Sequence, residues 1–351
     1  MNHKVVLGLS DGVDSAVAAR VLQDEGYEVY GLYLDISGEN AKRDAISSAK
    51  RLGIPLRIQN IQKELEKYVC RPFLEAYLRG ETPNPCIGCN PEVKFPALID
   101  YADEIQAHWI ATGHYARCEN GAIYTGAPDN DQSYMLTRLT KAQIARLLLP
   151  LGRFHKHKVR EMAREMGLSV ADKPDSREIC FIPSKDYASW LEENAEAPGK
   201  GEAIYCGRAV AMHEGIHKYT VGQRFGETEE GRRLYVSAID AEKNQLLLAL
   251  WDDLFHTQFY VRDMYWQAED DPDEIKAIVR VRHTRWEMPS CTVKKEGGRW
   301  QVTAQTPLRA PAKGQTAAFY DGEKLLGGGF IDGVFTEASR QESPDNPDSC
   351  A

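Results

Sequence analysis

The first 110 residues alternate short apolar runs with longer segments whose apolar residues recur at helical spacing. The apolar runs, each typical of a buried strand, are KVVLGL, EVYGLYL, IPLRIQNI and HWIATGH. Parallel strands need long crossover connections, and helices usually supply them. The β-α-β-α-β order therefore predicts a parallel sheet with helices on both faces, which places this part of the chain in the α/β class.

A change in composition marks the end of the α/β region. Helical spacing continues through residues 131–168, and a Pro/Gly-rich break, NAEAPGKG, follows at 194–201. Short strand-like runs with turns come after it, as is typical of small β-barrels or sandwiches. We expect an α/β domain over residues 1–198, a small β-rich domain over 199–254, a barrel-like domain over 255–335 and a flexible tail over 336–351.

The charge balance excludes a wholly basic nucleic-acid-binding surface. The 351 residues include 43 Lys and Arg against 52 Asp and Glu, a net charge of −9. Contact with a nucleic acid must then come from local basic clusters, such as HKHKVR at 155–160. We expect no membrane segment, because no apolar stretch reaches the roughly 18 residues that span a bilayer. Eight sparse cysteines without a secretion signal favour a reducing, cytoplasmic location.

The stretch LSDGVDSAV follows the first expected strand and opens the first expected helix. In that geometry, backbone N–H groups and the positive end of the helix face an anion. Ser10 and Ser15 add hydroxyl donors, Gly12 lets the backbone approach a ligand closely, and Asp14 either caps the helix or helps to hold Mg²⁺. The alternative interpretation is an ordinary capped strand–turn–helix of an α/β domain.

This loop lacks the Walker pattern and resembles the Ser-Gly-Gly-x-Asp-Ser loop of the PP-loop ATP pyrophosphatases. The resemblance implies that ATP is split between its α and β phosphates, that a carbonyl oxygen is adenylated and that pyrophosphate is released. Asp11 stands where these proteins have their second glycine, and its carboxylate could repel phosphate, face solvent or bind Mg²⁺. The residues expected at the nucleotide here are Leu9, Ser10, Asp11, Gly12, Val13, Asp14 and Ser15.

Two stretches carry cysteines in chemically suggestive settings. TPNPCIGCN places Cys86 and Cys89 in a C-x-x-C, whose spacing lets both sulfurs face one metal or each other. Cys180 lies in DSREICFIP, where a polar loop leads into an apolar segment. A redox pair, half of a zinc site and part of an iron–sulfur site all remain open for the C-x-x-C. Cys70 lies in a helical pattern and is expected to be a buried small hydrophobe.

Taken together, the chain resembles the tRNA-specific 2-thiouridylases of the MnmA/TrmU type over residues 4–335. The motifs, in family order, are LSDGVDSAV, TPNPCIGCN with EVKF, ATGHYAR, DQSYML, DSREICFIP, HKYTVGQR and KGQTAAFYDGEKLLGGGFI. The resemblance implies a PP-loop catalytic domain that uses ATP and Mg²⁺ to adenylate O2 of the wobble uridine of tRNA. Sulfur then attacks C2, and AMP leaves.

The same resemblance assigns roles to the cysteines. Cys180 is expected to receive the sulfur as a persulfide, and Cys89 to be the partner nucleophile that frees it. Well-known members have aspartate where this chain has Cys86. The extra thiol opens a second mechanism, in which Cys86, Cys89 and Cys180 hold three irons of a [4Fe–4S] cluster and the fourth iron carries sulfide. Cys86 as a spare thiol is the third interpretation. The expected sulfur source is a cysteine desulfurase, a sulfur carrier protein or sulfide.

Further positions are expected at the nucleotide or the tRNA. The resemblance implies that Leu34 lies near adenine and that Gly113 follows a strand at the ligand-binding edge of the sheet. The expected tRNA contacts are His114, Asp131, Gln132, Ser133, Gln223, Arg224, Arg280 and Arg282. Alternation in VRVRHTR predicts that Arg280 and Arg282 share one strand face, as a basic stripe. Structural roles are the alternatives: a buried histidine, helix caps at Gln132 and Ser133, and a solvated strand.

Two rival functions remain open from the sequence. The first is an amide-forming PP-loop ligase, which has no need of the cysteines. The second is a non-catalytic RNA- or metal-binding protein with a degenerate phosphate loop, which the presence of Asp11 suggests. Formation of thiolated tRNA with ATP separates all three.

Overall fold

The computed structural model describes residues 3–10, 12–36, 39–173, 179–182, 184, 186–267, 272–282 and 288–334. The chain forms two compact units. The first comprises Met1–Arg71, Pro85–Lys185 and Tyr320–Gly327, and the second comprises Pro72–Asn84, Asp186–Phe319 and Gly328–Ala351. Each unit therefore includes a segment that lies far along the sequence from the rest of it.

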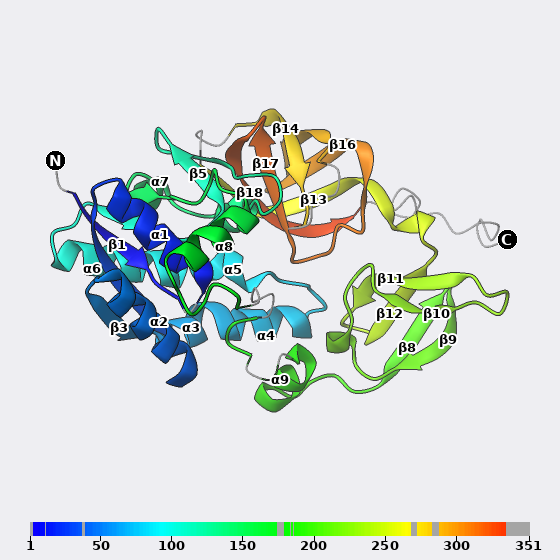
Figure 1. Ribbon diagram of the computed structural model, residues 1–351. Helices are drawn as coiled ribbons and strands as arrows, with labels where there is room; N and C mark the ends of the chain where they lie inside the picture. Colours follow the sequence, from blue (N-terminus) through cyan, green and yellow to red (C-terminus); the bar gives the residue numbers. More distant parts are fainter. Residues whose placement is uncertain are drawn as a thin grey trace. The chain divides into compact units, whose positions relative to one another are not determined.

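A five-stranded parallel sheet forms the centre of the first unit (Figure 1). Its strand order is β3-β2-β1-β4-β7, and all of its described pairings are parallel. The strands are β1 (Lys4–Gly8), β2 (Glu28–Asp35), β3 (Leu56–Asn60), β4 (Trp109–Ala111) and β7 (Leu147–Leu148). Val5, Val6 and Leu7 have no exposed surface, because β1 is covered on both faces. The predicted parallel α/β sheet is confirmed.

Helices cover both faces of this sheet. One apolar cluster joins Val5 and Leu7 of β1 to α1 (Val13–Asp24), α2 (Glu39–Leu52) and α8 (Lys156–Glu165). On the other face, Leu98 of α6 (Phe95–Glu104) packs against Gly8, which alternates with Leu7 along β1. Within the described residues, no helix combines the length and the apolar character that crossing a bilayer requires.

Two helical segments contain π turns. The first runs through α3 (Gln62–Leu65), η1 (Glu66–Cys70) and α4 (Arg71–Leu78), and the second through α5 (Pro85–Cys89), η2 (Asn90–Lys94) and α6. Pro72 and Pro91 lack a backbone N–H and lie at or beside these wider turns, which accommodate the missing hydrogen bonds. The turn η1 packs against α5, so Cys70 is brought next to the helix that carries the C-x-x-C.

Shorter elements complete the first unit. They are β5 (Ala116–Glu119), β6 (Ala122–Thr125), η3 (Ser133–Leu136) and α7 (Lys141–Ile144). Thr140 and Gln143 cap α7 reciprocally. The stretch from 131 to 150 therefore forms a 3₁₀ turn, a four-residue helix and strand β7 rather than the continuous helix that its spacing predicts.

The second unit holds two small β structures, as expected for the later part of the chain (Figure 1). The first is a sheet of order β10-β11-β12-β8-β9, built from β8 (Gly201–Tyr205), β9 (Arg208–His213), β10 (Arg224–Glu227), β11 (Arg233–Asp240) and β12 (Gln245–Ala249). Helix α9 (Tyr187–Asn194) precedes it, and η4 (Ile216–Lys218) and η5 (Asp252–Leu254) are 3₁₀ turns.

The second β structure is a closed barrel, because β13 pairs with β18 in addition to the order β13-β16-β15-β14-β17-β18. Its strands are β13 (Phe255–Trp266), β14 (Glu274–Arg280), β15 (Ser290–Glu296), β16 (Arg299–Arg309), β17 (Thr316–Asp321) and β18 (Lys324–Val334). The tip of the β17–β18 hairpin, Tyr320–Gly327, belongs to the first unit, where Lys324 pairs with Tyr124 of β6.

Candidate active site

The strand order creates a switch point between β1 and β4. From β1 the chain moves outward through β2 to β3, whereas β4 lies on the other side of β1. Ligands of open α/β sheets bind outside the carboxyl ends of the strands at such a point. The loop at Ser10 and Gly12 follows β1, Gly113 follows β4, and the half-buried Leu34 lies near the end of the adjacent β2.

Hydroxyl groups shape the loop between β1 and α1. The Ser10 N–H donates to Ser15 Oγ at 3.0 Å, and the Gly12 N–H donates to Ser10 Oγ at 3.2 Å. The two serine hydroxyls lie 3.1 Å apart. Among the described residues, no side chain caps α1, so the capped-turn alternative lacks its cap. Uncapped N–H groups at a helix start are donors for an anion.

Leu9, Val13 and Asp11 were also predicted to lie at the nucleotide. Leu9 and Val13 are buried at 1% and 4% exposure, so their side chains belong to the core and only their backbones can face a ligand. Asp11 lies outside the described residues.

Gly113 lies directly against the start of α1. A Cβ atom built on Gly113 would be 3.0 Å from the Ser15 nitrogen and 3.1 Å from the Asp14 carbonyl carbon. Both neighbours are backbone atoms, which cannot move aside as a flexible side chain can. A glycine after β4 is therefore what lets β4 and the phosphate loop approach each other this closely.

Asp14 is engaged by two residues from distant parts of the chain. Lys156 Nζ lies 2.7 Å from each of its carboxylate oxygens, and Tyr115 Oη donates to Oδ1 at 2.6 Å. Asp14 does not cap α1. The expected role of Asp14 as a Mg²⁺ ligand stays a prediction, because each carboxylate oxygen has more than one lone pair. Sequence reasoning missed Lys156, although its basic cluster HKHKVR was visible.

The C-x-x-C lies on the short helix α5, and Cys180 joins it from a segment about ninety residues later. The pKa of the Cys180 thiol is raised to about 11, first by burial and then by the neighbouring Cys86 and Cys89, with Lys94 opposing them. Burial also raises the pKa of Cys89, again opposed by Lys94. Solvent still reaches the exposed side chain of Cys180. The fold therefore makes electrostatic neighbours of these three thiols.

Cys70 is a fourth thiol in this group. It is buried as expected, and burial raises its pKa to about 12, with Glu66 and then Cys180 and Cys89 adding to the effect. Nothing in the helical pattern around Cys70 could reveal its proximity to the C-x-x-C, because that proximity depends on the packing of η1 against α5.

The thiols do not form a metal site in this structure. Across the described residues, which include Cys70, Cys86, Cys89 and Cys180, no group of three His, Cys, Asp or Glu side chains is arranged to hold a metal ion. The [4Fe–4S] interpretation is therefore not confirmed by this arrangement and stays a prediction.

The charge of Lys94 acts both on the thiols and on His114, which follows strand β4. Half-buried Lys94 ends η2, and its charge lowers the pKa of Cys89, Cys180 and His114. Burial, followed by Lys94, holds the pKa of His114 well below its ordinary 6.5, so the imidazole is neutral at pH 7. Its Nδ1 lies 2.7 Å from Thr112 Oγ1. Lys94 was visible only as part of the EVKF motif.

The side chains of Asp131, Gln132 and Ser133 in the DQSY motif form hydrogen bonds within the protein. Asp131 accepts from the Gly126 N–H at 2.8 Å and from Ser133 Oγ at 3.0 Å. Gln132 Oε1 accepts from the Tyr115 N–H at 3.1 Å. Ser133 has no exposed surface, so the expectation that its side chain contacts tRNA is wrong.

The expected basic stripe at Arg280 and Arg282 is also wrong. Arg280 is the last residue of β14, only 5% exposed, and its Nε donates to the carbonyl of Arg282. Arg282 lies beyond the strand and donates to the carbonyls of Val221 and Ala310 at 3.1 and 2.9 Å. These guanidinium groups satisfy backbone carbonyls instead of forming a basic surface.

Gln223 and Arg224 are exposed, so they stay available as tRNA contacts. Gln223 Oε1 accepts from the Thr220 N–H at 3.0 Å, and Arg224 pairs with Glu227.

Comparison with known proteins covers nearly the whole chain. Residues 3–184 match the tRNA methyl transferase HUP domain, residues 191–249 the tRNA methyl transferase PRC-barrel domain and residues 256–331 the aminomethyltransferase beta-barrel domain. A protein of Geobacter metallireducens, named tRNA-specific 2-thiouridylase MnmA, is 36% identical over 360 residues, which cover 95% of this chain and 98% of that protein. The chain belongs to the MnmA family.

Two further MnmA relatives are similar over the same extent. A protein of Caldanaerobacter subterraneus named MnmA 2 is 38% identical over 94% of this chain and 98% of its own length. The MnmA of Clostridium acetobutylicum is 37% identical over 94% of this chain and 100% of its own length. Membership of the MnmA family confirms the resemblance predicted from the order of the motifs.

Proposed function

We propose that this MnmA family member is an ATP-dependent tRNA-uridine 2-sulfurtransferase. The observation that carries the proposal is the grouping of Cys89 and Cys180 around Lys94, which also acts on His114 at the switch point of the sheet. A nucleotide site and a pair of thiols are the two parts that thiolation with ATP requires. The relatives named tRNA-specific 2-thiouridylases support the same reaction.

The first step is adenylation of the wobble uridine. Its O2 attacks the α-phosphorus of ATP, the bond between the α-phosphorus and the bridging oxygen breaks, and pyrophosphate leaves. The N–H groups at the start of α1, which no side chain in the described residues caps, bind the phosphates, and the loop at Ser10 and Gly12 lies beside them. When bound, Mg²⁺ would neutralise phosphate charge. Adenylation turns the oxygen on C2 into part of a good leaving group, AMP.

The second step transfers sulfur. The terminal sulfur of a Cys180 persulfide attacks C2, and the C2–O bond to AMP breaks. The Cys89 thiolate then attacks Sγ of Cys180, which breaks the persulfide S–S bond and leaves the sulfur on the uridine. The product is a Cys89–Cys180 disulfide, and an external thiol reductant returns both cysteines to the reduced form. Lys94 assists because its charge stabilises both thiolates.

The persulfide itself must come from outside the chain. An exposed Cys180 is accessible to a cysteine desulfurase or a sulfur carrier protein, which would pass on its sulfane sulfur. Sulfide is a source only for the alternative cluster mechanism, because a thiol and sulfide form a persulfide only with a two-electron oxidant. The need for tRNA and for reduced thiols favours the cytoplasm as the location.

The presence of two neighbouring thiols distinguishes thiolation from the alternative functions. Descriptions of the matching domains mention methyl transfer, and PP-loop ligases form amides, but neither reaction needs a second thiol beside Cys180. A purely RNA-binding protein would not need an open anion site at α1.

The test is a reaction of the purified protein with unmodified tRNA, ATP and a cysteine desulfurase with cysteine. We expect 2-thiouridine by mass spectrometry of tRNA nucleosides, together with pyrophosphate. Cys180→Ser and Cys89→Ser should abolish 2-thiouridine while pyrophosphate is still formed from ATP and tRNA. Cys118→Ser, in the half-buried cysteine of β5, is the matched control and should stay active. Normal thiolation by Cys180→Ser would refute the proposal.

A further inference from the structure

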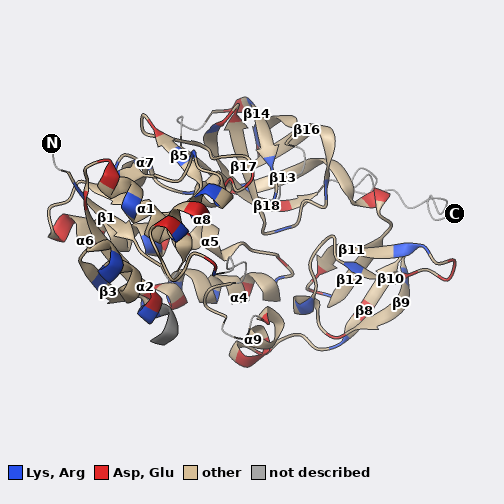
Figure 2. Cartoon of the chain, in the orientation of Figure 1, with Lys and Arg blue, Asp and Glu red and all other residues tan. Residues whose placement is uncertain are grey.

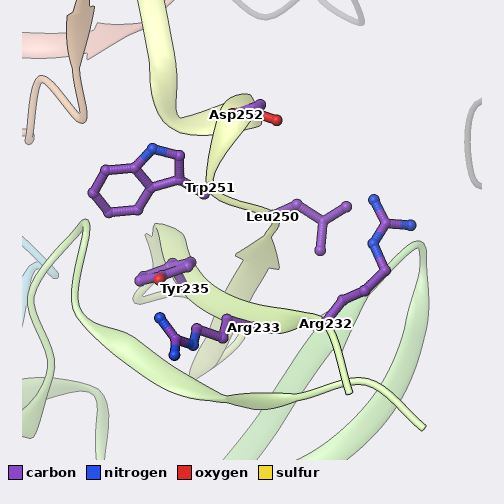
Figure 3. Close-up of a pocket in the computed structure, with 6 residues that line it drawn as sticks. All are labelled: Arg232, Arg233, Tyr235, Leu250, Trp251 and Asp252. Carbon is purple, nitrogen blue, oxygen red and sulfur yellow. The ribbon is translucent and has the colours of Figure 1, made fainter. Parts of the chain in front are cut away.

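The second unit contains an open cavity of about 480 Å³ that the proposed reaction does not use. Such a volume lies within the roughly 300–1,000 Å³ of small-ligand sites. Its lining combines cationic, aromatic and acidic side chains: Arg232, Arg233, Tyr235, Leu250, Trp251 and Asp252 (Figure 3). They come from the start of β11 and from the turn between β12 and β13.

Trp251 forms the aromatic wall of this cavity. It is 40% exposed, which is unusual for so large an apolar side chain. The Tyr235 ring meets it edge-on at 5.3 Å, and the Phe255 ring does so at 6.0 Å. The Arg309 guanidinium lies 4.2 Å from its ring centroid. Neighbours on several sides therefore fix the orientation of the indole while much of its surface stays in solvent.

Arg309 links this wall to the HKYTVGQR loop. Its guanidinium donates to the carbonyl of Gly222 at 3.3 Å, next to the exposed Gln223 and Arg224. Arg309 therefore contacts both the aromatic wall of the cavity and the loop that the sequence suggested as a tRNA contact.

The cations at the cavity belong to the β10–β11 hairpin. Arg232 and Arg233 are both exposed, and Figure 3 shows their guanidinium groups on different sides of the cavity floor. Two acidic side chains lie near these cations. Asp252 lines the cavity, and the pKa of Glu230 is lowered first by a hydrogen bond from Thr228, with the charge of Arg232 adding to the effect. Figure 2 shows the basic start of β11, in blue, next to the acidic turn between β10 and β11, in red.

We propose that this cavity binds one unpaired nucleotide of the tRNA, with its base against Trp251 and its phosphate at Arg232 or Arg233. A fixed, exposed indole is the platform on which single-stranded bases stack, and adjacent guanidinium groups bind the backbone. Asp252 supplies an acceptor for an exocyclic amino group, which a phosphate-only site would not contain. The inference rests on the proposed function, since it makes the cavity a second tRNA contact outside the catalytic domain.

The experiment measures tRNA binding and thiolation separately in the full-length protein. Trp251→Ala should raise the Kd for unmodified tRNA and the KM for tRNA by about 5- to 100-fold, the range for loss of one stacked base. At saturating tRNA, kcat should be unchanged. Trp251→Phe, which keeps a stacking ring, should restore most of the affinity and also shows whether Trp251→Ala merely misfolds.

The arginines are tested through salt dependence. Arg232→Ala with Arg233→Ala should weaken binding and lower the slope of log Kd against log salt by about one for each lost phosphate contact. Arg208→Ala, on the exposed strand β9 of the same β-sheet, is the matched control and should leave the slope unchanged.

A short fluorescein-labelled single-stranded RNA is the direct probe of the cavity. Wild-type protein should bind it, and Trp251→Ala should bind it more weakly by a similar factor. If tRNA and this RNA bind Trp251→Ala as tightly as wild type, the inference is wrong even if thiolation is normal. Weaker binding of a cysteine desulfurase with unchanged RNA binding would also overturn it, in favour of a protein partner. Absence of thiolation in wild type would overturn the proposed function. The comparison of RNA binding by wild type and Trp251→Ala would still test whether the cavity binds a nucleotide.

Discussion

Lys156 lies 2.7 Å from both carboxylate oxygens of Asp14, although 142 residues separate the two along the chain. The pair ties α8 to the first turn of α1, directly beside the phosphate loop. Both side chains are largely shielded, at 17% exposure for Lys156 and 29% for Asp14. The pair therefore holds the start of α1 in place beside the phosphate loop.

Removing the cation of this pair should weaken both the fold and the nucleotide site. Lys156→Met removes the cation beside the shielded Asp14, to which Tyr115 still donates, so we expect a loss of about 1–2 kcal/mol in the free energy of unfolding. The KM for ATP should rise, because α1 no longer has a fixed start. Urea unfolding and tRNA-dependent pyrophosphate release measure the two effects. Wild-type values for both in Lys156→Met would show that the pair has no such role.

Lys94 should set the pH dependence of sulfur transfer. Burial raises the pKa of Cys89, whose thiolate releases the sulfur from Cys180, so the rate should rise about tenfold for each pH unit below that pKa. Lys94→Met removes a cation that lowers the pKa of Cys89 and Cys180, so the rising limb of the rate profile should move to higher pH. Single-turnover thiolation between pH 6 and 10 measures the shift. Lys63→Met, at an exposed lysine of α3, is the control, and an equal shift there would contradict the assignment.

The raised pKa of Cys180 has a consequence for stability. Folding raises the pKa of Cys180 from 9.0 to about 11, so the folded state favours the neutral thiol. Its stabilising contribution is complete below pH 9 and is lost as the pH rises toward 11. Cys180→Ser should therefore flatten the fall in stability over this alkaline range, which urea unfolding at several pH values would detect.

Gly113 should tolerate no side chain. In Gly113→Ala the new Cβ meets the backbone of Ser15 at 3.0 Å and of Asp14 at 3.1 Å, so α1 and β4 must separate. Overpacking of this kind costs about 1–3 kcal/mol, and we expect the KM for ATP to rise with it. Gly199→Ala, where the Cβ has no neighbour within 4 Å, is the matched control. Equal kinetics for the two variants would show that close approach at Gly113 is dispensable.

Cys86 should be dispensable for thiolation if sulfur passes through a persulfide. Cys86→Ser keeps Cys89 and Cys180, so 2-thiouridine formation should stay within about a factor of three of wild type. Protein purified without oxygen should thiolate tRNA while containing no stoichiometric iron or sulfide. Brown protein with bound iron, whose activity disappears in Cys86→Ser, would establish the cluster mechanism instead.

The predicted β-α-β-α-β order is found in the structure because it rests on local periodicity. A continuous apolar run such as Val5–Val6–Leu7 is typical of a parallel strand that is covered on both faces. The structure predicted from local spacing was wrong at two places, where contacts with distant residues determined the structure instead. Residues 131–150 have helical spacing, yet their end pairs with β4 as strand β7. The alternation in VRVRHTR predicts that Arg280 is an exposed strand residue, yet Arg280 is buried at the end of β14.

The parallel strands of the first unit and the family could be predicted from the sequence, because periodicity and motifs are properties of neighbouring residues. The meeting of distant groups could not: Lys156 with Asp14, Cys180 with the C-x-x-C, and Arg309 with Trp251. Such contacts depend on the order of strands in the sheet and on the packing of helices across it. No local pattern encodes them, since each partner's neighbours in sequence are the same whether or not the contact forms.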